Sequence, residues 1–231
     1  MGRAMSDDST ERDTTDRRPL KSRGMRWATR LAGWLAGSGI TPNQISLFSV
    51  ILAVLCLLLL WTSTHANSGV RALCLLLAAV LCQLRLLCNL MDGMVAIEGG
   101  KSTPAGALWN EVPDRVADVA ILVGFGIAAE AVVWGWAAAS IALTIAYLRE
   151  LGKGIDGHVD FSGPMAKPQR MALMTIALLL ASATMTVLSS SPAAGLYATL
   201  VLQAGLWICI GGSLMTAWRR TRHIHQRLSR H

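Results

Sequence analysis

The chain has 231 residues, of which 53% are hydrophobic and 15% are charged, and its mean hydropathy is +0.46. This composition is too apolar for an ordinary soluble domain of this size and predicts an integral membrane protein. The net charge of +7 does not indicate nucleic acid, because the basic residues crowd both ends of the chain beside apolar segments, where anionic lipid headgroups are the simpler partner. The five cysteines lie in apolar runs without CxxC spacing, so neither a disulfide framework nor a zinc site is indicated.

The N-terminal part divides into a tail and a helix. Residues 1–22 are polar, charged and poor in large apolar side chains, which is typical of a disordered tail. Residues 23–39 repeat an apolar face at helical spacing in Trp27, Leu31, Trp34 and Leu35. Because arginines lie on the other faces, this pattern predicts an amphipathic helix in the membrane interface.

A second helix start follows directly. Thr41 has the position of an N-cap, Pro42 that of the first helical residue, and Gln44 that of the partner in a capping box. We expect the chain to turn into the membrane at this point.

Six apolar segments make up residues 40–218, which we expect to form one membrane domain. They lie at about 44–61, 70–89, 105–129, 132–148, 170–188 and 195–217. Each is close to the roughly 20 residues that a helix needs to cross the hydrocarbon core. Lys and Arg are concentrated in the even-numbered connections and at both ends, so the positive-inside rule places these parts and both termini in the cytoplasm. The expected fold is all-α and multi-pass, with six transmembrane helices after the interfacial helix and a basic cytoplasmic tail at 219–231.

Polar residues gather where the second and third segments meet the cytoplasm. At helical spacing, the second segment carries Arg85, Asn89 and Asp92, and the third carries Asn110, Asp114 and Asp118. Residues at this spacing share a helix face, so we expect the two polar faces to meet. Carboxylate and amide oxygens without thiolate or imidazole suit a hard cation such as Mg²⁺ or Mn²⁺, and hence a phosphate-bearing substrate.

Two other interpretations of this cluster do not need a substrate site. The polar residues would then hold helices together, for example through a salt bridge between Arg85 and Asp92. A small transporter or proton pathway would instead use intramembrane charges such as Arg85 and Asp118. A transporter should carry polar residues through the depth of several helices, whereas the first, fifth and sixth segments have few.

The stretch NLMDGMVAIEGGKSTPAGALWNEVPD, residues 89–114, resembles the motif of the CDP-alcohol phosphatidyltransferase family. The family pattern is D-x2-D-G-x2-A-R-x8-G-x3-D-x3-D. The chain keeps this spacing throughout, and its residues at the eight fixed positions are Asn89, Asp92, Gly93, Ala96, Ile97, Gly106, Asn110 and Asp114. The six-helix plan, the interfacial helix and the entry to the first segment are also similar to the family.

The resemblance implies a membrane enzyme of phospholipid biosynthesis that depends on a divalent metal, Mg²⁺ or Mn²⁺. It would move a phosphatidyl or similar phosphoalcohol group from a CDP-linked lipid donor to an acceptor hydroxyl and release CMP. Metal binding falls on Asn89, Asp92, Asn110 and Asp114, and nucleotide binding on Asn89, Gly93, Ala96 and Gly106. Asp114 would also be the general base. A homodimer in a bacterial inner membrane, with no nucleic-acid partner, is expected from the same resemblance.

The departures from the motif leave a second hypothesis open. Asn replaces Asp at positions 89 and 110, so the charge of the four acidic positions falls from −4 to −2, and Ile97 replaces the arginine. Fewer carboxylates attract two dications less strongly, although Glu111 and Asp118 are spaced to contribute further ligands. The chain is therefore either an active enzyme or a catalytically weakened member that acts as a nucleotide- or lipid-binding partner subunit. The sequence does not name the acceptor.

Basic residues near the fourth-to-fifth connection lie on the same predicted side of the membrane. Arg149, Lys167 and Arg170 are candidates to bind a phosphate of the acceptor or of the lipid. The alternative is that they only reflect the positive-inside topology.

Overall fold

The computed structural model describes residues 26–98 and 105–229, and all regular structure within these ranges is α-helical. The helices are α2 (Arg26–Gly37), α3 (Pro42–Ser63), α4 (Ser68–Glu98), α5 (Gly106–Ala128), α6 (Val132–Asp156), α7 (Lys167–Val187) and α8 (Ala194–Leu228). The predicted tail at 1–22 lies outside the described residues.

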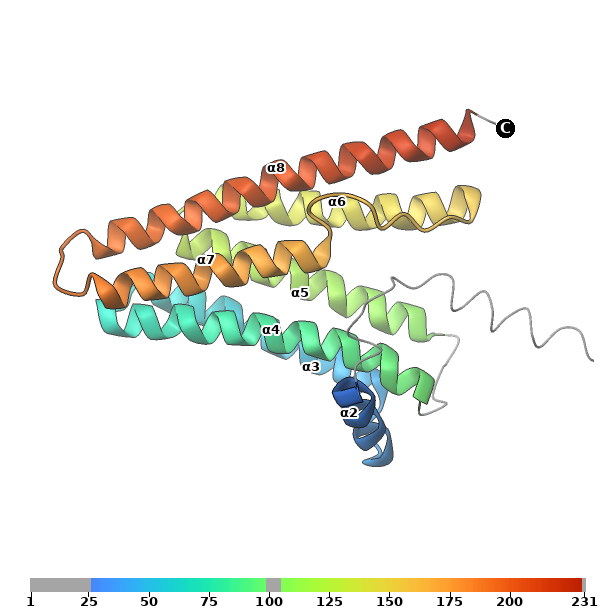
Figure 1. Cartoon of the computed structure of the whole chain (residues 1–231), viewed down its shortest axis with the longest axis horizontal. Coiled ribbons are helices and arrows are strands. Elements are labelled where there is room, and N and C mark those ends of the chain that lie inside the picture. Colours follow the sequence, from blue (N-terminus) through green and yellow to red (C-terminus); the bar gives the residue numbers. More distant parts are fainter. Residues whose placement is uncertain (1–25, 99–104, 230–231) are drawn as a thin grey trace, which may run out of the picture.

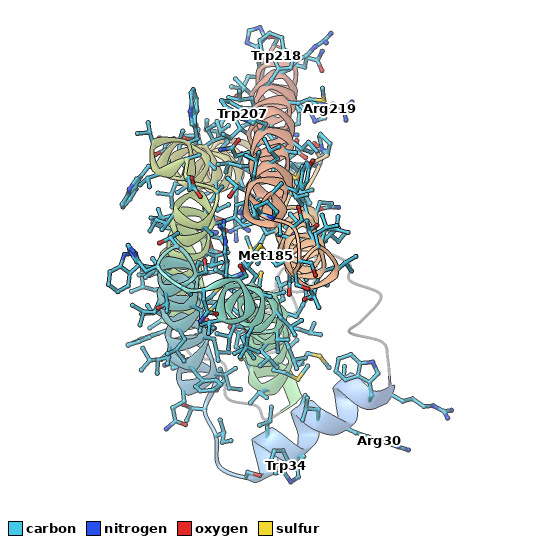
Figure 2. The ribbon with its side chains drawn as sticks, turned by 90° about the vertical axis from the view of Figure 1, so that its left-hand side faces the viewer. Arg30, Trp34, Met185, Trp207, Trp218 and Arg219 are labelled. Atoms are coloured by element: carbon cyan, nitrogen blue, oxygen red, sulfur yellow. The ribbon has the colours of Figure 1, made fainter. Side chains whose placement is uncertain are left out.

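Helices α3 to α8 run side by side along the long axis, and α2 lies across one end of the bundle (Figure 1). Ala28 and Ala32 of α2 are buried in a small apolar cluster with Met91, Met94 and Val95 of α4. The small alanines allow α2 to approach the last turns of α4 closely. Arg30 and Trp34 project away from the rest of the bundle (Figure 2). An interfacial location for α2 remains a prediction.

The predicted start of α3 is confirmed. Thr41 is the N-cap and Pro42 is the first helical residue. The Gln44 backbone N–H donates to the Thr41 hydroxyl at 3.3 Å, and the Thr41 N–H donates to the Gln44 side chain at 2.9 Å. This capping box satisfies two backbone donors that would otherwise be unpaired where the helix begins.

The core of the bundle is formed by apolar side chains from α3 to α8, and α5 packs mainly against α3 and α6. The fully buried members include Leu60, Leu75, Ile121, Phe125, Leu178 and Leu206. Many large apolar side chains also face outward, among them Phe48, Leu76, Ile176 and Leu200. An outer surface of this kind suits contact with lipid chains, so the fold is that of a multi-pass membrane protein.

The number of spanning helices is confirmed only in part. Within the described residues, α3, α4, α6, α7 and α8 are long and apolar enough to cross a membrane. Helix α5 is not among them, and its first half carries the charged residues Glu111, Asp114, Arg115 and Asp118. The sixth span therefore remains a prediction.

Three helices extend well beyond the predicted segments. Helix α4 continues past residue 89 to Glu98, α6 past residue 148 to Asp156, and α8 past residue 217 to Leu228. Most of the expected basic tail is therefore the end of a long helix. Ile224 explains why the helix persists, since it is buried and lies close to Gly152 of α6.

Helices α5 and α6 meet backbone to backbone at Gly126 and Gly135. A Cβ added at Gly126 would lie 2.5 Å from the Gly135 Cα, and one added at Gly135 would lie 2.8 Å from the Gly126 Cα. We expect Gly126→Ala to lower the free energy of unfolding by about 1–3 kcal/mol, because the two helices must separate. Gly211→Ala is the matched control, since its Cβ would meet open space. Thermal unfolding in detergent measures both, and equal melting temperatures would contradict the close contact.

Candidate active site

A buried arginine lies at the centre of the polar cluster. The Arg85 side chain, on α4, is 0% exposed. Its Nη2 atom lies 2.6 Å from Asp114 Oδ1 and 2.8 Å from Asp118 Oδ1, and it donates to the Asp114 carbonyl oxygen at 3.0 Å. One guanidinium thus joins α4 to two successive turns of α5. The salt bridge with Asp92 that the sequence suggested is replaced by pairs with the two aspartates of α5.

The first turn of α7 supplies two more cations. The Lys167 ammonium contacts Asp114 Oδ1, and Arg170 Nη2 lies 2.6 Å from Asp118 Oδ2. The Asn89 amide lies between two of these groups, and the orientation that satisfies both of them places its nitrogen 2.7 Å from Asp114 Oδ1 and its oxygen 2.5 Å from Lys167 Nζ. The structure therefore joins α4, α5 and α7 through paired charges.

Asp92 has a different environment. It is 4% exposed, and its carboxylate accepts hydrogen bonds from the Ser46 hydroxyl at 2.9 Å and the Gly93 backbone N–H at 2.6 Å. Lys167 and Asp114 lie close enough to interact with its charge. Ser46 was not found from the sequence, because a serine one turn after the start of α3 carries no signal that it faces α4.

The remaining acidic candidate on α5 is paired with arginines. Glu111 contacts Arg115 on its own helix, and its Oε1 lies 2.6 Å from Arg149 Nη2 at the end of α6. Both Asp118 oxygens face the arginines described above. Glu111 and Asp118 therefore already have cationic partners within the chain.

The other motif positions lie around the ends of α4 and α5. Asn110 is exposed in the first turn of α5, while Gly106 and Ala96 are half-buried. A Cβ at Gly93 would have no atom of a more distant residue within 4 Å, so this turn of α4 is not packed against a neighbouring helix at Gly93. Residues 99–104, which join the two helices, lie outside the described part.

The donor groups at this end fit a hard divalent cation. They are the Asp92 and Asp114 carboxylates and the Asn89 and Asn110 amides, all oxygen ligands of the kind that Mg²⁺ and Mn²⁺ prefer. Among the described residues, no three Asp, Glu, His or Cys side chains converge as a metal site. A cation here would need amide, water or substrate oxygens to complete its shell, which Mg²⁺ tolerates because it retains waters.

The loop at 157–166 positions Lys167 and Arg170. It doubles back along α6 before α7 begins (Figure 1). Asp160 Oδ2 lies 2.9 Å from His223 Nδ1 of α8, and Arg220 of α8 donates to the Ser162 carbonyl at 3.1 Å. Burial alone would raise the pKa of Asp160, but hydrogen bonds from Ser162 and His223 outweigh burial and hold this pKa below its usual value. The loop is thus held on α8 by an ionised carboxylate.

Comparison with known proteins identifies the family. The family described as CDP-alcohol phosphatidyltransferase matches residues 39–215, so the chain belongs to the CDP-alcohol phosphatidyltransferase family. This confirms the resemblance read from the motif and assigns the chain to a class of enzymes for phosphatidyl transfer in phospholipid biosynthesis.

One relative is similar in sequence, and solved structures of another protein are similar in fold at about 20% identity. The inner membrane protein YnbA of Escherichia coli (strain K12) is 28% identical over 144 residues, which cover 59% of this chain and 66% of that protein. Phosphatidylinositol phosphate synthase (PgsA1) of Mycobacterium tuberculosis, in complex with manganese and citrate, has a TM-score of 0.67 and 19% identity over 85% of this chain and 88% of its own. The same enzyme with CDP-DAG bound has a TM-score of 0.66 and 21% identity, covering 87% and 94%.

The buried pairs of Arg85 generate a stability prediction. Arg85→Met removes one cationic partner from each of the buried carboxylates of Asp114 and Asp118. We expect it to lower the free energy of unfolding by about 3–5 kcal/mol. Arg149→Met removes a pair that is partly exposed and should cost about 1 kcal/mol or less. Chemical unfolding in detergent compares the two variants. A similar loss in both would contradict a central role for Arg85.

Acid should loosen the 157–166 loop. Because the pKa of Asp160 is lowered in the folded protein, its stabilising contribution is complete above the ordinary carboxyl pKa of about 4 and is lost as the pH falls below it. Hydrogen exchange, corrected for intrinsic rates, should show weaker protection of the loop relative to α7 at pH 3 than at pH 7. In Asp160→Asn the loop should be less protected at pH 7 and should lose this pH dependence. An unchanged dependence in the variant would exclude Asp160 as its cause.

Proposed function

We propose that the protein transfers a phosphatidyl or similar phosphoalcohol group from a CDP-linked lipid to an acceptor hydroxyl and releases CMP. One observation carries the proposal: the carboxylates of Asp92 and Asp114 lie at the adjoining ends of α4 and α5, at the motif spacing. Family membership over residues 39–215 supports it.

Asp92 and the amide oxygen of Asn110 are the groups that we propose to hold a divalent cation, Mg²⁺ or Mn²⁺, and the Asn89 oxygen would join them once Lys167 turns to an anionic ligand. When bound, such an ion neutralises charge on the donor's diphosphate and on the departing CMP. The manganese in a structure of similar fold supports this assignment. Small residues at Gly93, Ala96 and Gly106 leave room for the nucleotide.

Asp114 is the proposed general base. Its carboxylate would take the proton of the acceptor hydroxyl as the hydroxyl oxygen bonds to phosphorus and the bond to CMP breaks. Lys167 now contacts the same carboxylate, so an anionic group that attracts Lys167 would leave Asp114 freer to accept a proton.

The candidates for binding phosphate differ in accessibility. Lys167 and Arg149 are partly exposed, and we propose them as contacts for a phosphate of the acceptor or lipid. Arg170 is 2% exposed and pairs with Asp118, so its predicted phosphate contact would require that pair to open. Its observed contact joins α7 to α5.

The proposal also covers the topology, the oligomeric state and the location of the enzyme. We propose six transmembrane helices with both termini in the cytoplasm, and a homodimer in a bacterial inner membrane. Charge placement in the sequence supports the orientation. Similarity to an inner membrane protein of Escherichia coli supports the location.

The test is CMP release by the purified full-length protein in lipid nanodiscs. With CDP-diacylglycerol and a panel of hydroxyl acceptors, CMP should appear only when Mg²⁺ or Mn²⁺ is added. Asp92→Ala and Asp114→Ala should reduce the rate at least 100-fold, in the range expected for loss of a metal ligand or a general base. Glu130→Gln, which removes an exposed carboxylate that pairs only loosely with Arg71 and with none of the proposed site residues, should retain the rate.

Release that is unchanged in both alanine variants would contradict the assignment. A folded wild-type protein that binds CDP-lipid but releases no CMP with any acceptor would favour the alternative of a partner subunit.

A further inference from the structure

We propose that this site takes one divalent cation, at Asp92, and that Lys167 and Arg85 of the chain itself provide the positive charge at Asp114. The inference rests on the proposed function and refines it. Asp114 is then the base and not a metal ligand, and the asparagines at 89 and 110 belong to an altered charge arrangement.

The charges of the cluster balance without a second metal ion. Asp92, Asp114 and Asp118 contribute three negative charges, and Arg85, Lys167 and Arg170 contribute three positive charges. The neighbouring Arg115 and Arg149 are balanced by Glu111 and Glu150. The cluster is therefore neutral before any ion binds. One dication adds two positive charges, which an anionic diphosphate can offset. A second dication would add two more charges in a largely buried site, where like charges repel strongly.

Asp114 already has cations at its oxygens. Arg85 Nη2 lies 2.6 Å from Oδ1 and Lys167 contacts the same atom, while Arg115 Nη1 lies 3.4 Å from Oδ2. A metal ion ligated by Asp114 would lie next to these cations. Arg85 has little freedom to withdraw, since it is fully buried and also paired with Asp118.

Asp92 presents the opposite situation. Its hydrogen bonds come from two neutral donors, the Ser46 hydroxyl and the Gly93 N–H. Asp92 is therefore the motif carboxylate that a cation can approach with the least repulsion.

Asn89 matches this arrangement better than an aspartate would. Its amide nitrogen donates to Asp114 and its oxygen accepts from Lys167. A carboxylate at position 89 could accept from Lys167 but could not donate to Asp114, and it would place two negative charges side by side. The amide is thus complementary to an aspartate that is already paired with a lysine.

The experiment counts Mn²⁺ ions on the purified full-length protein in nanodiscs, without substrate, from the electron paramagnetic resonance signal of free Mn²⁺. The wild type should bind one Mn²⁺ per chain, and Asp92→Ala should weaken binding at least tenfold. The charge-conserving double variant Asp114→Asn with Lys167→Gln should still bind one Mn²⁺, with an affinity within threefold of the wild type. Thermal unfolding confirms that each variant is folded.

A second pair of variants tests the role of the lysine. Asn89→Asp with Lys167→Gln adds a carboxylate, removes the cation and should create a second Mn²⁺ site. Asn89→Asp with Lys153→Gln makes the same net charge change with an exposed lysine of α6 and should keep one site.

The inference is overturned if the wild type binds two Mn²⁺ or none, or if the charge-conserving double variant loses binding as Asp92→Ala does. It is also overturned if the two Asn89 variants bind equal numbers of ions. CMP release, measured on the same preparation, separates this inference from the proposed function. One bound Mn²⁺ without CMP release contradicts the function alone, and CMP release with two bound Mn²⁺ contradicts the one-ion inference alone.

Discussion

The buried guanidinium of Arg85 is the constraint on which the polar end of this bundle depends. A fully buried cation in an apolar helix bundle requires anionic partners, because desolvation of an unpaired charge is costly. Asp114 and Asp118 meet this requirement, and they hold α5 at a fixed depth and rotation against α4. Lys167 and Arg170 then bind the same two carboxylates and fix the start of α7.

The same contacts explain why α5 differs from its neighbours. Its first half carries the carboxylates that pair with α4 and α7, and its second half supplies Ile121 and Phe125 to the core. The helix is therefore buried by protein along much of its length, and its charged side chains are paired within the bundle. Polar residues in a membrane bundle are tolerated when they face the interior and are paired.

The interpretation of the polar cluster as helix contacts describes part of it, because Asp118 with Arg85 and Arg170 forms a structural ion-pair network. The ligand site is a proposal for the other part, where Asp92 accepts hydrogen bonds from two neutral donors. Asp114 links the two parts, because it pairs with Arg85 and also has the last position of the motif.

The sequence by itself determined the features that depend on short-range spacing. The capping box at Thr41, the helical character of the apolar segments and the motif from Asn89 to Asp114 could all be read from residues a few positions apart, because helix geometry fixes which of them share a face. The extension of α8 could not, since it depends on Ile224 packing near Gly152 of α6.

Only the tertiary structure decided which charges face each other. Lys167 reaches Asp114 across 53 positions of the chain, and Ser46 reaches Asp92 across 46. Such pairs depend on the depth and rotation of whole helices, which are set by contacts such as that between Gly126 and Gly135. Helical periodicity shows which residues share one face of a helix. It does not show at which depth in the bundle that face meets a neighbouring helix. For this reason the sequence identified the charged residues of the site, whereas the pairing of Asp114 and Asp118 with Arg85, Lys167 and Arg170 emerged only from the packed bundle.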